Sequence, residues 1–329
     1  MRGRGISYDT GWVLRGRNSR DFFEPEQVER DLTVIRDDLH CNTVRIMGGD
    51  AGRIEIAARY AAQLGLEVWF SPYPLDLTTD EMLDLFADCA DRAERLRTGG
   101  AEVVFVTGAE LSLMALGFLP GANTDERVAA LLTDRQRIPG LAAQINEFLG
   151  RAVKVVRERF GGPVTYASVQ LEQVDWTPFD IISVDLYRSK EIVDQFAAGV
   201  KILAAETKPV AVTEFGTASY RNAGDVGAQG MQIVENDEAG TPVRLKGVYE
   251  RDEAGQGAYI RELLEIFDAG GIDTAFVFTF ALSSFPHRPD GDPRDDLDLA
   301  SYGIVRVGED GTWAPKESFR AVGDFYSSS

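Results

Sequence analysis

The 329-residue sequence contains few cysteines, few histidines and relatively few basic residues. Its two cysteines are too few for the disulfide framework of a small secreted domain, so we expect both to be buried thiols. Its two histidines nearly exclude a metal site that needs several histidine ligands, and we expect no metal ion. Lys and Arg number 34 against 53 Asp and Glu, giving a formal net charge of -19 at pH 7. This charge argues against nucleic acid or an anionic membrane as the main partner, because both bind basic surfaces.

Long apolar stretches are also missing from the sequence. No run approaches the roughly 20 residues that cross a bilayer. The segment 1–6 lacks the apolar core of a signal peptide. We therefore expect a cytoplasmic protein that does not bind a membrane.

Eight short apolar runs alternate with amphipathic helical segments along the chain. The strand-like runs cover residues 5–9, 41–47, 67–71, 103–110, 164–169, 180–187, 210–216 and 275–280. The helical segments cover residues 25–39, 50–64, 79–97, 145–160, a stretch that ends near 205, 251–269 and a last helix near 315–326. No linker rich in Gly, Ser or Pro separates these units. They predict a single-domain α/β fold over residues 1–329, a (β/α)8 TIM barrel.

Two connections of the predicted barrel are long. The segment 111–140 follows the fourth strand and the segment 215–250 follows the seventh, and both are expected to shape the pocket. A doubly wound open sheet is the alternative fold. No Gly-x-Gly-x-x-Gly or Gly-x-x-x-x-Gly-Lys-Ser/Thr motif follows any strand-like run, which favours the barrel.

Two of the strand-like runs end in a glutamate, Glu110 and Glu214. In each run the period of two puts the glutamate on the same face as the valines that precede it. In a (β/α)8 barrel the carboxyl ends of all strands meet at one mouth, where barrel enzymes carry out their chemistry. We therefore expect the two glutamates to form one site.

Other polar and aromatic residues stand at or near the ends of the remaining strands. The set comprises Tyr8, Asp9, Arg45, Tyr73, Asp185, Tyr187, Phe278 and Phe280, with His287 in the loop after the last strand. Glycoside cleavage needs one carboxyl as proton donor and a second that attacks or stabilises the anomeric carbon. The set therefore predicts a pocket for a small carbohydrate or glycoside-like substrate. Tyr8, Asp9 and Asp185 suit a structural role equally well, and strand phenylalanines are more often core residues.

Several short stretches are shared with one group of enzymes. They are Asn-Thr-Val-Arg-Ile at 42–46, Glu110, Tyr187, Thr-Glu-Phe-Gly at 213–216, Tyr-Gly-Ile-Val at 302–305, Asp-Gly at 310–311 and Pro-Lys at 315–316. In these features the sequence resembles the clan A glycoside hydrolases, which carry a retaining two-glutamate site on a (β/α)8 barrel. The resemblance implies that Glu110 is the acid/base, that Glu214 is the nucleophile, and that Arg45 and Tyr187 orient Glu214. It also implies a hydrolase or transglycosidase of O-glycosyl bonds that needs no cofactor.

The sequence departs from this clan at two positions. Ala109 stands where the clan usually has an asparagine that binds the sugar 2-hydroxyl, and phenylalanines stand where many members have a strand-eight tryptophan. Losing the 2-hydroxyl contact removes several kcal/mol of transition-state binding. Three hypotheses stay open: a glycosidase for an unusual sugar, a catalytically lapsed barrel that binds a glycan, and a non-glycosidic acid/base enzyme of secondary metabolism. The chain is also similar to actinobacterial proteins labelled abortive phage infection proteins, which connects the second hypothesis with phage defence.

Overall fold

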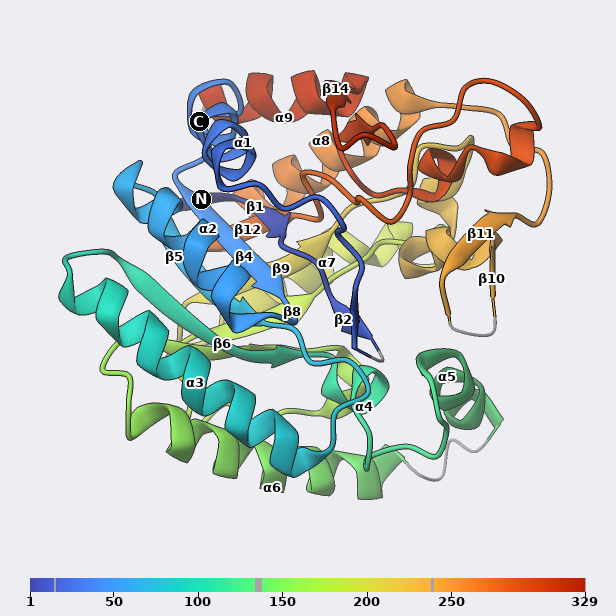
Figure 1. Ribbon diagram of the computed structural model, residues 1–329. Coiled ribbons are helices and arrows are strands. Elements are labelled where there is room, and N and C mark those ends of the chain that lie inside the picture. The colour runs from blue at the N-terminus through green and yellow to red at the C-terminus, as the bar shows by residue number, and fades with distance from the viewer. Residues whose placement is uncertain (15, 134–137, 238–239, 329) are drawn as a thin grey trace.

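The computed structural model describes residues 1–14, 16–133, 138–237 and 240–328. Its central strands are β1 (Gly3–Asp9), β4 (Thr43–Gly48), β5 (Glu67–Pro72), β6 (Val103–Ala109), β7 (Val164–Ala167), β8 (Ile182–Asp185), β9 (Val210–Phe215) and β12 (Thr274–Val277). They form one parallel sheet in the order β7-β6-β5-β4-β1-β12-β9-β8. A parallel bridge between Ser168 and Val184 joins the two ends of this sheet. The sheet is therefore a nearly closed barrel, and the predicted (β/α)8 fold is confirmed (Figure 1).

Helices cover the outside of the barrel between successive strands (Figure 1). They are α1 (Pro25–Asp37), α2 (Ala51–Gln63), α3 (Thr79–Thr98), α6 (Ile138–Arg157), α7 (Val193–Ala204) and α8 (Glu253–Gly270), followed by α9 (Glu317–Ser327). At the start of α2 the Asp50 side chain accepts a hydrogen bond from the Arg53 amide, and at the start of α3 Thr78 and Glu81 form a capping box. Such caps bond amide groups that have no partner within the helix, and so they fix where each helix begins.

The alternation of side chains along each strand divides the core into two layers. Outward-facing residues such as Ile6, Val44 and Phe105 pack beneath the helices in one large cluster. Inward-facing residues such as Trp69 and Val104 form a second cluster. This inner cluster also includes residues of the loops that follow the strands. Every residue of β4, β6 and β9 is buried, as expected for parallel strands covered on both faces.

Besides η2 (Gln170–Glu172) after β7, four connections at the carboxyl end of the barrel carry secondary structure of their own. The elements are β2 (Val13–Leu14) and β3 (Arg17–Asn18) after β1; α4 (Leu111–Met114) and α5 (Thr124–Thr133) after β6; η3 (Ala223–Asp225), η4 (Gly227–Ile233), β10 (Val234–Asn236) and β11 (Pro242–Leu245) after β9; and η5 (Pro293–Asp295), η6 (Leu297–Ala300), β13 (Val305–Val307) and β14 (Trp313–Pro315) after β12. The long loops predicted after the fourth and seventh strands are confirmed. The short hairpins are not foreseen, because strands of two to four residues carry no usable period. In Figure 1, β2, α5 and the β10–β11 hairpin gather on one side of the barrel.

Several predicted strands run past the observed ones, and two of these differences bear on the site. The strand predicted over 180–187 corresponds to β8, which covers only Ile182–Asp185, and the strand predicted over 275–280 corresponds to β12, which ends at Val277. Residues 186–187 and 278–280 therefore belong to the mouth of the barrel rather than to its wall. None of the described helices is long and apolar enough to cross a membrane. Cys41 and Cys89 are both buried and free.

Candidate active site at the mouth of the barrel

Glu214 lies near the end of β9 with both of its carboxylate oxygens bonded. Arg45 Nη1 lies 2.9 Å from Oε1, and the Tyr187 hydroxyl donates a hydrogen bond to Oε2 at 3.2 Å. The Arg45 side chain is completely buried inside the barrel. It is held by the Ser71 hydroxyl at 3.1 Å and by the Thr213 carbonyl at 3.1 Å. A buried arginine fixed at several points is a rigid counter-ion for one carboxylate.

Glu110 follows the last residue of β6 and has different surroundings. Its backbone is left-handed (φ 44°), and its amide donates a hydrogen bond to the Ala167 carbonyl at 2.9 Å. The side chain is only partly buried. Within the described part of the chain, its carboxyl group makes no hydrogen bond or ion pair, whereas both oxygens of Glu214 are bonded. The two glutamates predicted to share a site are thus brought together in unequal environments.

The unequal surroundings act on the pKa values of the two carboxyl groups. Loss of hydration, together with the negative charges of Glu214 and Glu172, raises the pKa of Glu110 to about 8, and the Arg45 charge only partly opposes this shift. Burial also raises the pKa of Glu214, but there the Arg45 charge and the hydrogen bonds from Arg45 and Tyr187 act in the opposite direction. The surroundings of Glu110 therefore favour its protonated form, whereas Arg45 and Tyr187 favour the charged form of Glu214.

A buried carboxyl group that the sequence did not single out braces the segment after Glu110. Glu172, in η2 (Gln170–Glu172), is completely buried and accepts hydrogen bonds from the Ser112 amide at 3.0 Å and from the Tyr166 hydroxyl at 2.8 and 2.9 Å. The Leu111 amide donates to the same Tyr166 hydroxyl at 2.7 Å. The first two amides after Glu110 are thereby fixed. Burial raises the pKa of Glu172 to about 7, so this group is charged in the pH range where Glu110 titrates.

We expect Glu172→Gln to move the alkaline limb of the activity profile toward lower pH. A glutamine keeps an oxygen for the Ser112 amide but removes the negative charge that helps to raise the pKa of Glu110. Glu110 then loses its proton at a lower pH, and kcat/KM at pH 8 falls by about 3- to 10-fold. Full pH profiles of the variant, the wild type and Glu158→Gln, an exposed control, measure this. An equal loss of activity at every pH would instead assign Glu172 a purely structural role.

Asp185 and Tyr73 lie beside the glutamate pair. Asp185 is the register partner of Glu214 on the adjacent strand, and its buried carboxyl oxygens have no hydrogen-bond partner among the described residues. Burial and the Glu214 charge raise the pKa of Asp185 well above its usual range. The Thr213 hydroxyl opposes this shift only in part. The pKa of Tyr73 is raised by burial and by the charges of Glu214 and Glu110. Both residues therefore lie close enough to the glutamates to interact with their charges.

Phe278 also lies in the inner cluster, where its ring centroid is 6.1 Å from that of Tyr302. Tyr302 in turn lies 6.0 Å from Tyr187. The Tyr302 hydroxyl accepts a hydrogen bond from the Gly230 amide at 2.9 Å and donates one to the Gly227 carbonyl at 3.1 Å. Tyr302 thus links η4 to Tyr187, whose hydroxyl donates a hydrogen bond to Glu214. From the sequence, Tyr302 was recognised only as part of a family-like ending, without a role.

Four residues of the predicted set do not contact the glutamate pair. The Tyr8 hydroxyl donates to Asp31 on α1 at 2.8 Å, and the ring of Phe280 packs on Tyr8 and Trp313 in the outer cluster. Both predictions were wrong because these two side chains face the helices rather than the mouth.

Asp9 and His287 instead form contacts within the loops around the mouth. Asp9 accepts a hydrogen bond from the Gly11 amide at 2.7 Å, and burial raises its pKa to about 6 against the opposing charges of Arg20 and Arg53. The His287 Nδ1 lies 3.0 Å from Asp296. Neither side chain bonds to Glu110 or Glu214, so their predicted role in the pocket finds no support. Among the described residues, no three His, Cys, Asp or Glu side chains are grouped in a way that could hold a metal ion.

A cavity of about 750 Å³ lies among the loops at the mouth of the barrel. It lies between the β2–β3 hairpin, residues of 228–236 and 240–246, and the loop that carries Phe285 and Arg288. Trp12 lines this cavity, and its ring centroid is 5.6 Å from that of Tyr73. Trp12 therefore joins the lining of this cavity to Tyr73, whose pKa responds to the charges of both glutamates. Trp12 was missed because it lies outside any strand-like run.

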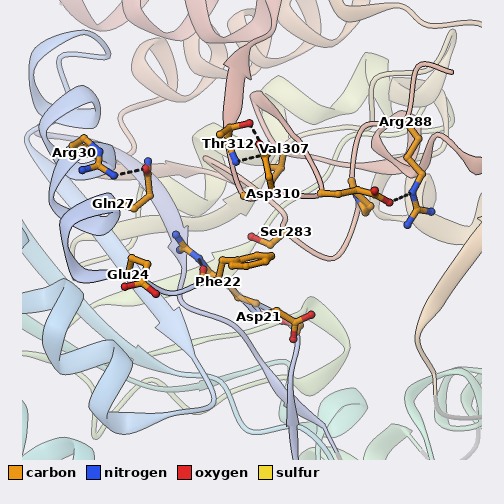
Figure 2. Close-up of a pocket in the computed structure, with 16 residues that line it drawn as sticks. Asp21, Phe22, Glu24, Gln27, Arg30, Ser283, Arg288, Val307, Asp310 and Thr312 are labelled. Carbon is orange, nitrogen blue, oxygen red and sulfur yellow. Dashed lines mark hydrogen bonds and ion pairs between the residues drawn. The ribbon is translucent and has the colours of Figure 1, made fainter.

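A second cavity, of about 390 Å³, continues from the first. The two share Ser19, Asp21, Ser283, Pro286 and Arg288. Figure 2 shows the Phe22 ring beside Ser283, with Asp21 farther along the N-terminal loop and Thr312 on the other side of Ser283. Phe22 is 59% exposed, which is unusual for a phenylalanine. The two cavities together form an extended surface from the barrel mouth to α1.

Comparison with solved structures identifies the fold. The chain matches a GH113 β-1,4-mannanase over 100% of both chains, with a TM-score of 0.61 and 16% sequence identity. It matches the GH113 β-mannanase of Alicyclobacillus acidocaldarius over 99% of this chain and 97% of that one (TM-score 0.60, 15% identity). The match to a β-glucuronidase from Ruminococcus gnavus covers 99% of this chain and 49% of that enzyme (TM-score 0.57, 15% identity). No protein-family model and no curated protein matches the sequence.

The chain therefore shares the (β/α)8 barrel fold of these enzymes. At 15 or 16% identity the likeness extends to the fold alone. The similarity to abortive phage infection proteins has no counterpart in these three matches and stays a prediction.

Proposed function

We propose that this protein is a single-domain retaining glycoside hydrolase or transglycosidase, with Glu214 as nucleophile and Glu110 as acid/base. The observation that carries this proposal is the asymmetry of the pair. Glu214 is held as an anion by Arg45 and Tyr187, whereas the unbonded Glu110 has a pKa of about 8. A retaining reaction needs one carboxylate that attacks and one carboxylic acid that donates a proton.

The reaction then proceeds in two steps. Glu110 gives its proton to the glycosidic oxygen while Glu214 attacks the anomeric carbon, so that the bond to the leaving group breaks and a glycosyl ester forms on Glu214. Glu110, now a carboxylate, takes a proton from water or from an acceptor hydroxyl. The resulting oxygen nucleophile attacks the anomeric carbon and releases Glu214. Arg45 and Tyr187 hold the attacking carboxylate in place throughout, and Asp185, Tyr73 and Phe278 surround the sugar.

The likeness to mannanases and a glucuronidase supports a carbohydrate as the substrate. The free thiols of Cys41 and Cys89 suit a reducing compartment, and we place the enzyme in the cytoplasm.

A second candidate, a catalytically lapsed barrel that binds a glycan and acts in phage defence, is favoured by one observation. Ala109 is buried next to Glu110 and offers no polar side-chain atom for a sugar hydroxyl. A barrel that binds its sugar without cleaving it, or one that performs other acid/base chemistry, is compatible with that feature.

The wild-type protein should be screened on a panel of 4-nitrophenyl α- and β-glycosides of glucose, mannose, galactose and glucuronic acid. The expected result is turnover of one of them, with a first-formed product that keeps the anomeric configuration in ¹H NMR spectra. Inversion would rule out Glu214 as a nucleophile. If a sugar raises the melting temperature of the protein but is not turned over, the lapsed barrel is supported. If neither assay gives a signal, non-glycosidic chemistry is supported.

A further inference from the structure

The cavity of about 750 Å³ beside Trp12 differs in charge from the rest of the molecule. The whole chain has 53 acidic and 34 basic residues. The charged side chains that line the cavity are Arg17, Lys246, Arg288 and Asp21, so cations outnumber anions there by three to one. The second cavity has no excess of cations. Its arginines are offset by four acidic residues, Asp21, Glu24, Glu309 and Asp310 (Figure 2).

Two of the three cations are not committed to an ion pair. Arg288 lies 2.7 Å from Glu309. Arg17 and Lys246 are exposed, on β3 and just after β11, and neither forms a salt bridge with a described residue. The Lys246 ammonium group donates only to the Gln232 carbonyl, at 2.7 Å. Both cations therefore remain able to bind an anion.

The remaining lining of the cavity is mixed, with somewhat more apolar than polar residues. Trp12, Leu75, Met231 and Phe285 border it, and all four belong to or pack against the inner cluster that contains Tyr73 and Phe278. A volume of about 750 Å³ is within the usual range for small-molecule sites, which combine apolar walls with a few polar groups. The tryptophan ring offers a flat face where the cavity lining meets Tyr73.

From these observations we infer that this cavity is the subsite for the leaving group, and that it takes a flat apolar group bearing a negative charge. That the bound group is a leaving group rests on the proposed function, whereas its chemistry follows from the cavity itself. Arg17 and Lys246 bind the charge, and Trp12 stacks on the apolar part. A carboxylate, a sulfate and a phosphate share this chemistry. The net charge of -19 repels anions at long range, so selection must come from these short-range contacts.

The first test measures binding without turnover. The probes are 2-naphthol, 6-hydroxy-2-naphthoate and 2-naphthol-6-sulfonate, titrated by calorimetry in low salt. We expect both anions to bind about tenfold more tightly than 2-naphthol, because a charge-assisted hydrogen bond contributes about this much. The advantage should shrink when the NaCl concentration is raised about tenfold from a low-salt buffer. Tighter binding of the carboxylate than of the sulfonate would show that the site prefers a planar anionic group.

Variants assign the effect to the residues named. In the double variant Arg17→Gln/Lys246→Gln the ratio of anion to naphthol affinity should fall to about one, whereas Trp12→Ala should weaken all three probes. The matched control is Lys201→Gln/Arg320→Gln, which removes two exposed cations from α7 and α9. Equal affinity for naphthol and the anions in the wild type, or a preference that survives the double variant, overturns the inference.

The second test uses turnover to separate this inference from the proposed function. It compares the 2-naphthyl and 6-carboxy-2-naphthyl glycosides of the sugar found in the panel, whose leaving groups differ little in reactivity. A higher kcat/KM for the carboxylated glycoside, lost in the double variant, supports the inference. Turnover of both at equal efficiency overturns it while the proposed function stands. If the anions bind but no glycoside is turned over, the proposed function is refuted while the inferred anion site stands.

Discussion

Glu214→Gln should reduce the turnover of any glycoside substrate by about 10⁴-fold or more, because it removes the attacking group of the first step. The substitution changes one oxygen of the side chain to an amide nitrogen, so the shape of the site is kept. Arg45 can still donate to the remaining oxygen, and the fold should be unaffected. The loss therefore reports on chemistry rather than on folding.

Intact-mass spectrometry provides a readout that a structural defect cannot imitate. A 2-fluoro glycoside of the substrate sugar with an activated leaving group slows both steps, and the ester on Glu214 should accumulate in the wild type. The mass of the Glu214→Gln protein should stay unchanged under the same conditions. Glu206→Gln, an exposed residue after α7, is the control and should be labelled like the wild type. Labelling of the wild type at a residue other than Glu214 would transfer the nucleophile role to that residue.

The barrel and its glutamate pair were accessible from the sequence for one physical reason. A parallel strand buried on both faces is a short apolar run, and the polar residue that ends such a run stands at the mouth. Glu110 and Glu214 both satisfy that pattern. Arg45 could not be placed with the same certainty, since the sequence was also compatible with a simple salt-bridge arginine. Its bond to Glu214 spans 169 positions of the chain, and no local pattern encodes it.

The residues that the sequence misplaced or missed fall outside that pattern. Tyr8 and Asp9 are neighbours and both end a strand, but Tyr8 points to α1, so only one of the two faces the inside of the barrel. Glu172 lies in a short 3-10 turn rather than at a strand end. Its contact with the Ser112 amide joins residues 60 positions apart. Trp12 belongs to a hairpin too short to be recognised. Long-range contacts and short loop elements thus determine the details of the site.

Glu110→Gln should separate leaving groups according to how much they need a proton. Glycosides with poor leaving groups, such as an alkyl alcohol or a second sugar, should lose about 10²- to 10⁴-fold in kcat/KM, because the glutamine cannot protonate the departing oxygen. Glycosides of 2,4-dinitrophenol should lose far less in kcat/KM, since this group departs as an anion without help. A mutation that only distorted the pocket would weaken both kinds of substrate alike.

The same variant should also remove the alkaline limb of the pH profile. Glu110 donates its proton only while protonated, so the wild-type rate on a poor leaving group should fall as the pH rises through about 8. A glutamine does not titrate, and the residual activity of the variant should be level over that range. An alkaline limb that persists in Glu110→Gln must come from another group, and Asp185 is the next candidate. It lies beside Glu214, its buried oxygens have no partner among the described residues, and its pKa is likewise raised by burial. The double variant Glu110→Gln/Asp185→Asn then decides whether that carboxyl group holds the proton.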